Sequence, residues 1–134
     1  MSGIYGMNIK MAIYGESHGA SIGLVIDGVP PGLKLDLEQI EKEMARRAPG
    51  KNQLSTQRKE SDSFAIQSGF FEGYTTGTPL CVVIKNSDQH SKDYSILKDK
   101  MRPGHADYAG FVRYQGFNDY RGGGHFSGRL TTPL

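Results

Sequence analysis

Three consecutive glycines, Gly122–Gly124, constrain the fold of this chain more than any other feature of its sequence. Glycine loses more backbone freedom on folding than any other residue, so a compact chain keeps such a run where backbone must closely approach something else. The run is bracketed by Arg121 and Arg129, and Ser127 is a candidate N-cap for a helix that begins there. Backbone N–H groups, a helix N-terminus and two guanidiniums form a site for phosphate or another anion. The alternative interpretation is a surface loop with incidental charges.

The first third of the chain predicts a β-hairpin followed by a helix. Partial alternation over Asn8–Tyr14 and the apolar run Ser21–Ile26 predict two strands, joined by a turn that holds His18 between glycines. Asp36–Arg47 is the clearest helix, because Asp36 can cap it and Gln39 occupies the N3 position. Its apolar stripe, which we expect to be buried, is formed by Leu37, Ile40 and Met44.

The rest of the chain mixes loops, strands and short helices. Polar residues 51–62 lack periodicity and predict a long loop. Ser63–Phe71 and Pro79–Lys85 predict strands, and the apolar run within the second is typical of a central strand. Ala106–Tyr114 predicts a short helix, and another is expected to start at Ser127.

Composition places the chain among ordinary globular proteins. With 134 residues, 37% of them hydrophobic, and a formal net charge of +2, we expect one domain with a modest core. No apolar run approaches the roughly 20 residues that span a bilayer, and residues 1–10 lack the apolar region of a signal peptide. The single cysteine, Cys81, fits a reducing cytoplasm, and its apolar neighbours predict a buried thiol.

Two histidine turns carry further chemistry. His18 lies in Gly15–Gly19, and His105 lies in Arg102–Asp107, each beside charged residues. Imidazole changes charge near neutral pH, so either ring can exchange a proton with a substrate, and a glycine-flanked turn predicts that it is exposed enough to do so. The alternative is a hydrogen-bonded structural histidine. Metal binding is not expected, because none of the four histidines has a partner at metal-site spacing.

Together these segments resemble chorismate synthase. The matching segments run in family order along nearly the whole chain: Gly15–Gly19, Asp27–Gly32, Arg46–Gly50, Ser68–Gly69, Thr76–Pro79, Asp93–Tyr94, Arg102–Asp107 and Asp119–Arg129. Family proteins are much longer, so the resemblance identifies residues 1–134 as the N-terminal part of a chorismate synthase domain, truncated at its C-terminal end. It implies an α+β fold, an incomplete form of a β-α-β sandwich of antiparallel sheets and helices.

The resemblance also implies an activity. Chorismate synthases are lyases of the shikimate pathway that eliminate phosphate in a 1,4-anti sense from 5-enolpyruvylshikimate 3-phosphate and need reduced FMN, with NADPH as a possible reductant. It further implies a cytoplasmic homotetramer that binds neither nucleic acid nor membrane. Two rivals remain: a non-catalytic module that binds an anion or flavin, and a basic domain for nucleic acid, which the small net charge disfavours.

Site residues carry over by position. The family's proton donors match His18, associated with the departing phosphate, and His105, associated with the reduced flavin. Arg47 matches a ligand-contacting position, and Arg58 is a candidate for the second arginine that many members have where this chain has Gln53. A solvated basic loop is the alternative for both arginines. The flavin-contacting segment matches the residues after the glycine run: His125, Phe126 and Ser127.

Overall fold

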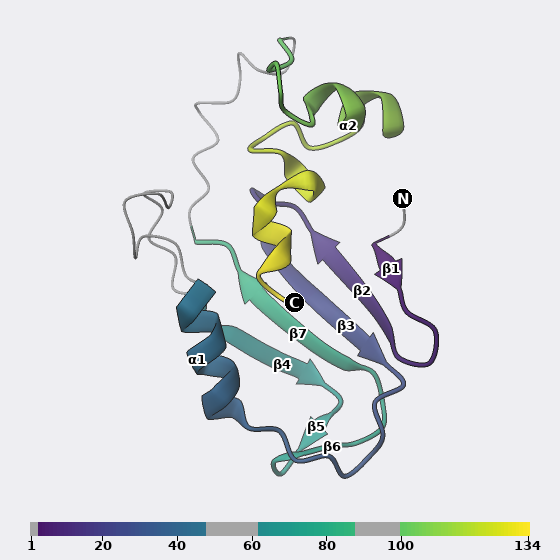
Figure 1. Ribbon diagram of the computed structural model, residues 1–134, viewed down its shortest axis with the longest axis vertical. Coiled ribbons are helices and arrows are strands. Elements are labelled where there is room, and N and C mark those ends of the chain that lie inside the picture. The colour runs from purple at the N-terminus through teal and green to yellow at the C-terminus, as the bar shows by residue number, and fades with distance from the viewer. Residues whose placement is uncertain (1–2, 48–61, 88–99) are drawn as a thin grey trace.

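The computed structural model describes residues 3–47, 62–87 and 100–134, and it confirms the α+β class. Its main element is a five-stranded antiparallel sheet with the strand order β1-β2-β3-β7-β4 (Figure 1). The strands are β1 (Ile4–Tyr5), β2 (Lys10–Gly15), β3 (Ser21–Asp27), β7 (Leu80–Lys85) and β4 (Phe64–Ser68). The predicted hairpin is confirmed, because β2 and β3 pair from Lys10↔Asp27 to Gly15↔Ile22 around the turn that holds His18. The apolar strand β7 is interior, as expected.

The prediction of one continuous strand over Ser63–Phe71 is wrong, because the segment forms two separate strands. Strand β4 ends at Ser68 after a shift of register opposite β7. Gly69 then takes a φ of 79°, and a Cβ there would lie 2.6 Å from Leu80 Cα. Only glycine fits this bend without strain. The chain continues as β5 (Phe70–Phe71), which pairs with β6 (Tyr74–Thr75) in a separate two-stranded sheet.

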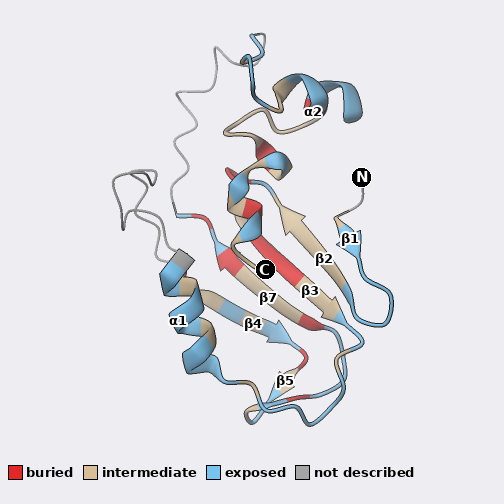
Figure 2. Ribbon diagram, viewed as in Figure 1, coloured by how far each residue is buried: buried red, intermediate tan, exposed pale blue. Residues whose placement is uncertain are grey.

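Helix α1 (Leu37–Arg47) begins where the sequence predicted. Asp36 caps it, because its Oδ1 accepts a hydrogen bond of 2.9 Å from the backbone N–H of Gln39. The expectation of a buried stripe is only partly met: Ile40 and Met44 are half-buried, whereas Leu37 is exposed. A groove remains open between Met44 and the C-terminal residues, so the helix is only partly packed against them. Figure 2 shows α1 as mostly exposed.

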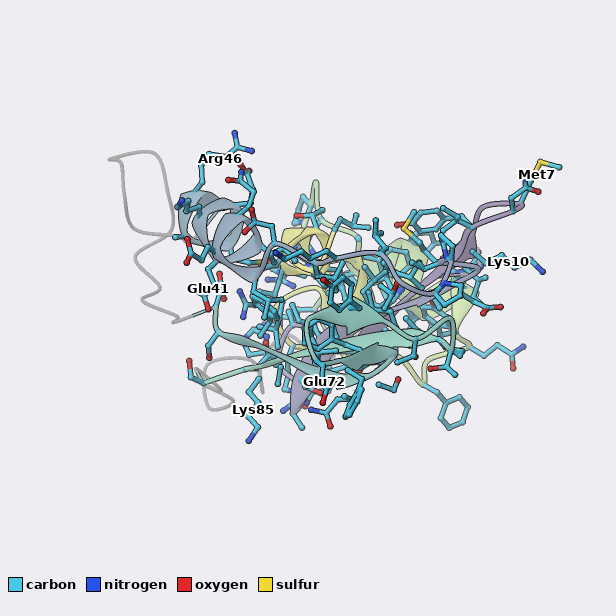
Figure 3. The ribbon with its side chains drawn as sticks, turned by 90° about the horizontal axis from the view of Figure 1, so that it is seen from below. Met7, Lys10, Glu41, Arg46, Glu72 and Lys85 are labelled. Atoms are coloured by element: carbon cyan, nitrogen blue, oxygen red, sulfur yellow. The ribbon has the colours of Figure 1, made fainter. Side chains whose placement is uncertain are left out.

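The core lies on one face of the sheet. Ile22 and Ile84, on neighbouring strands, pack against Leu130 of the C-terminal segment, and Met44 of α1 closes the cluster. Figures 1 and 3 show α1 and the C-terminal segment on this same side of the sheet. No described helix covers the opposite face, so Cys81, expected to be buried, is only half-buried.

The C-terminal part of the chain is built from short helices. Helix α2 (Asp107–Arg113) confirms the helix predicted over Ala106–Tyr114. The 3-10 turn η2 (Gly124–Phe126) begins at the last glycine of the run, and a second 3-10 turn, η3 (Gly128–Thr131), follows it. The helix expected at Ser127 therefore forms as a single 3-10 turn. Ser127 is its cap, because its Oγ accepts a hydrogen bond of 3.3 Å from Arg129 N. Within the described ranges, no helix has the length and apolar character to cross a membrane.

Candidate active site around the glycine run

The glycine run makes the close approach that its sequence predicted. Gly122, Gly123 and Gly124 have φ values of 55°, 99° and 55°, in the left-handed region that favours glycine. A Cβ on Gly122 would lie 2.1 Å from His18 Cε1, and one on Gly123 would lie 3.2 Å from His105 Cε1. Two adjacent glycines therefore contact both histidines that the sequence singled out, although the two rings come from distant parts of the chain.

The ring of His18 is enclosed. Only 2% of the residue is exposed, so the expectation of an exposed imidazole is wrong. The reason is that the His18 turn packs beneath the glycine run, where Ser17 N donates a 3.1 Å hydrogen bond to Gly124 O. A group that reacts with this ring has to reach a closed site.

Hydrogen bonding selects the tautomer of His18. The hydroxyl of Ser17 donates to Arg121 O at 3.4 Å and lies 3.1 Å from His18 Nδ1. A hydroxyl has a single proton, so an Oγ that donates to the carbonyl must accept from the ring. This network keeps a proton on Nδ1 of His18, and it fixes the plane of the imidazole.

The His105 ring belongs to a more open ion-pair cluster. Asp107 Oδ1 lies 2.6 Å from His105 Nδ1, and Arg102 binds the same carboxylate with both Nε and Nη2 at 2.9 Å. The hydrogen bonds from Arg102 hold the pKa of Asp107 far below its usual range. Asp107 therefore stays ionised, and the short contact makes Nδ1 of His105 a donor to it. This is the arrangement of a histidine oriented by a third group.

Both arginines that bracket the glycine run are already paired. Arg121 forms two hydrogen bonds of 2.8 Å with Asp119, and Arg129 Nη1 forms a buried ion pair with Asp62. Burial acts to raise the pKa of Asp119, but the hydrogen bonds from Arg121 outweigh it and lower the pKa. The guanidiniums that were expected to bind an anion are thus offset by carboxylates. The N–H group of Gly124 already donates to Arg121 O at 3.0 Å, so the N–H groups of Gly122 and Gly123 are the candidates for that role.

The three residues predicted to contact flavin are not equivalent. His125 and Phe126 line a cavity of about 370 Å³, whereas Ser127 caps η3 and lies outside its lining. The His125 ring is held by a 2.8 Å hydrogen bond between Nδ1 and Gly15 O. The other lining residues are Gly3, Ile13, Glu16, Tyr114, Phe117, Asn118, Asp119 and Gly123.

The predicted ligand-binding arginines lie beyond what the structure describes. Arg47 is the last residue of α1, but its side chain is outside the described residues. Arg58, Gln53 and His90 also fall outside the described ranges. Their assignments stay predictions.

Sequence reasoning missed three residues that build the site. Ser17 and Asp119 lie inside recognised segments, and their closeness to His18 and Arg121 in the sequence is a signal that could have found them. Asn86 has no such signal. It is buried at the end of β7, and its side chain binds two carbonyls of the His18 turn.

Comparison with known proteins gives one family. A family model described as chorismate synthase matches residues 9–134. The chorismate synthase of Pyrococcus abyssi is 54% identical over 131 residues, which cover 96% of this chain and 36% of the relative. That of Cytophaga hutchinsonii is 50% identical over 131 residues, covering 98% of this chain and 36% of the relative. The chain therefore spans about a third of the length of these curated relatives.

A solved structure agrees with the sequence comparisons. A crystal structure of chorismate synthase superimposes with a TM-score of 0.64 at 28% sequence identity. The match covers 95% of this chain and 31% of the solved chain. The likeness therefore extends over nearly all of this chain and a minor part of the larger protein.

Proposed function

This chain belongs to the chorismate synthase family, and we propose that it forms the N-terminal part of an enzyme that converts 5-enolpyruvylshikimate 3-phosphate to chorismate. The observation that carries the proposal is the convergence of His18 and His105 on Gly122 and Gly123. Two imidazoles that meet at one glycine backbone supply two positioned proton donors. In the proposed reaction the carbon–oxygen bond to phosphate breaks and the substrate also loses a proton.

The two histidines have surroundings suited to different tasks. His18 is buried, and Ser17 fixes the plane of its ring, so we assign it the protonation of the departing phosphate, with the imidazolium giving up its Nε2 proton and keeping the Nδ1 proton bonded to Ser17. His105 is more open and is held by ionised Asp107, which orients the ring. We assign it the proton transfer on the flavin side of the site. A positioned general acid contributes about 10²–10⁴-fold to rate.

The lining of the cavity fits the ring system of a flavin. Tyr114, Phe117 and Phe126 supply aromatic surface, and the backbone at Gly123 leaves room beside it. Its volume of about 370 Å³ falls within the usual range of roughly 300–1,000 Å³ for cofactor sites. Glu16 and Asp119 also line it, so a flavin phosphate would be held elsewhere, and Ser127 is a candidate.

Reduced FMN, when bound, would lend electron density to the reaction and receive it back without net redox change. NADPH as its reductant, a homotetrameric assembly and a cytoplasmic location belong to the same proposal, supported by the family alone. We also propose that the 134-residue chain alone does not turn over, because it spans about a third of its relatives.

The test is anaerobic phosphate release from 5-enolpyruvylshikimate 3-phosphate with reduced FMN. The protein is a chimaera in which this chain replaces the matching segment of the Pyrococcus abyssi relative. We expect turnover by the chimaera and none by the chain alone, and we expect His18→Ala and His105→Ala each to lower kcat by about 10²–10⁴-fold. His90→Ala is the control, since that histidine lies outside the family segments. A folded chimaera that binds FMN but releases no phosphate would support the non-catalytic module.

A further inference from the structure

Asn86 is the residue that holds the His18 turn from the neighbouring strand. It follows directly after β7, and only 7% of it is exposed. Its Nδ2 donates hydrogen bonds to Glu16 O at 3.0 Å and to Gly19 O at 2.8 Å. Its backbone N–H donates to Ala20 O at 3.2 Å. One residue therefore binds three carbonyls of the five-residue segment that joins β2 to β3.

The chemistry of the amide fixes its orientation. An amide nitrogen has two protons, and here each one has a carbonyl partner. The Oδ1 atom of Asn86 accepts a hydrogen bond from Arg129 Nε at 3.4 Å, and Arg129 is itself anchored by its ion pair with buried Asp62. A carboxylate in place of the amide would keep the arginine contact, but it would turn an oxygen toward the two carbonyls.

The position of the turn controls the ring that it carries. His18 is the middle residue of the segment, and its Cε1 lies 2.1 Å from the place where a Cβ on Gly122 would be. Its Nδ1 is held by Ser17 at 3.1 Å. With the ring enclosed on both sides, a displacement of the turn either presses the imidazole onto the glycine backbone or breaks the contact with Ser17.

We propose that Asn86 is a positioning residue for His18, acting through the turn. The inference rests on the proposed function, because it matters for catalysis only if His18 is a proton donor. Asn86 holds the carbonyls of Glu16 and Gly19 in register with β7, and the ring of His18 thereby keeps its tautomer and its direction.

The first experiment needs no turnover. Imidazole ¹⁵N shifts and the contact between the His18 ring and the Gly122 Hα protons are measured by NMR in the 134-residue chain. We expect Asn86→Asp to change the tautomer ratio of His18 and to weaken that contact, while the His105 signals stay unchanged. Ser87→Ala, at an exposed neighbour, is the control. Asn86→Asp is preferred to Asn86→Ala because it keeps an oxygen that accepts the hydrogen bond from Arg129, whereas the alanine variant could unfold the chain. A His18 ring that does not move overturns the inference.

The second experiment separates this inference from the proposed function. In the chimaera, Asn86→Asp should lower kcat by about 10–100-fold, as misplacement of a reacting group does, with KM changed less than about twofold. In a His18→Ala background the same substitution should cost nothing further. An additive loss there overturns the positioning role. A ring that moves while kcat stays normal overturns the catalytic role of His18 instead.

Discussion

Replacing Gly122 by alanine tests whether the close approach to His18 determines the site. The φ of 55° places any side chain in the left-handed region, which costs roughly 1–2 kcal/mol. The new Cβ would also lie 2.1 Å from His18 Cε1 and 2.5 Å from His18 Nδ1, so the ring or the loop must move. Such overpacking costs about 1–3 kcal/mol. We expect Gly122→Ala to lower the free energy of unfolding by about 2–5 kcal/mol, measured by urea denaturation at pH 7.

Two other glycines separate backbone strain from steric overlap. Gly104 has a φ of 73° with nothing within 4 Å of an added Cβ, so Gly104→Ala should show only the strain, roughly 1–2 kcal/mol. Gly128 has no positive φ and also meets nothing within 4 Å, so Gly128→Ala should be neutral or stabilise by up to about 1 kcal/mol. If Gly122→Ala costs no more than Gly104→Ala, the ring of His18 does not pack on the glycine run and the reasoning fails.

Three further predictions address single side chains. The pKa of Asp107 is lowered by folding, so its ion pair stabilises the fold above about pH 4, and this stability is lost as the pH falls further. In urea denaturation, Asp107→Asn should lower the free energy of unfolding by about 1–3 kcal/mol at pH 7. The gap in free energy of unfolding between this variant and the native chain should shrink toward pH 2. Arg47→Ala should weaken substrate or nucleotide binding by titration and shift the free energy of unfolding by less than about 1 kcal/mol, and the reverse result would make Arg47 a structural residue. Ser127→Ala removes the cap of η3 and should cost about 1 kcal/mol in the same denaturation assay, whereas an unchanged midpoint would contradict the capping role.

Local chemistry explains which elements could be predicted. The cap at Asp36, the alternation of Asn8–Tyr14 and the apolar run of Pro79–Lys85 are signals between residues close in sequence, and each produced the expected element. The strand from Ser63 to Phe71 failed because its break depends on Gly69 meeting the backbone of Leu80 on another strand. The exposure of Leu37 likewise depends on which other segments pack against its helix, and no periodicity in the sequence encodes that.

The site follows the same division. The glycine run predicted that its backbone closely approaches another group, but which groups it contacts depends on how the fold brings distant segments together. The β2–β3 turn brings His18 to Gly122, and the turn before α2 brings His105 to Gly123. The burial of His18 could not be predicted for the same reason, since a glycine-flanked turn is exposed only until another segment covers it. The role of Asn86 could not be predicted from the sequence, because its hydrogen-bond partners are backbone carbonyls, which every residue has.

Charge pairing in the site limits where an anionic substrate can be held. In the described part of the chain, Arg102, Arg121 and Arg129 each form an ion pair with a carboxylate close to the histidine turns and the glycine run. An ion pair has little net charge at the distance of a neighbouring ligand, and Arg129 is additionally buried. The substrate of the proposed reaction, with its phosphate and carboxylates, therefore has to meet the backbone N–H groups of Gly122 and Gly123, to displace one of these partners, or to meet cations from other segments. Within the proposed function, the pairing of these three arginines makes Arg47, at the end of α1, and Arg58 stronger candidates for binding the anionic substrate than their position in a basic stretch alone would.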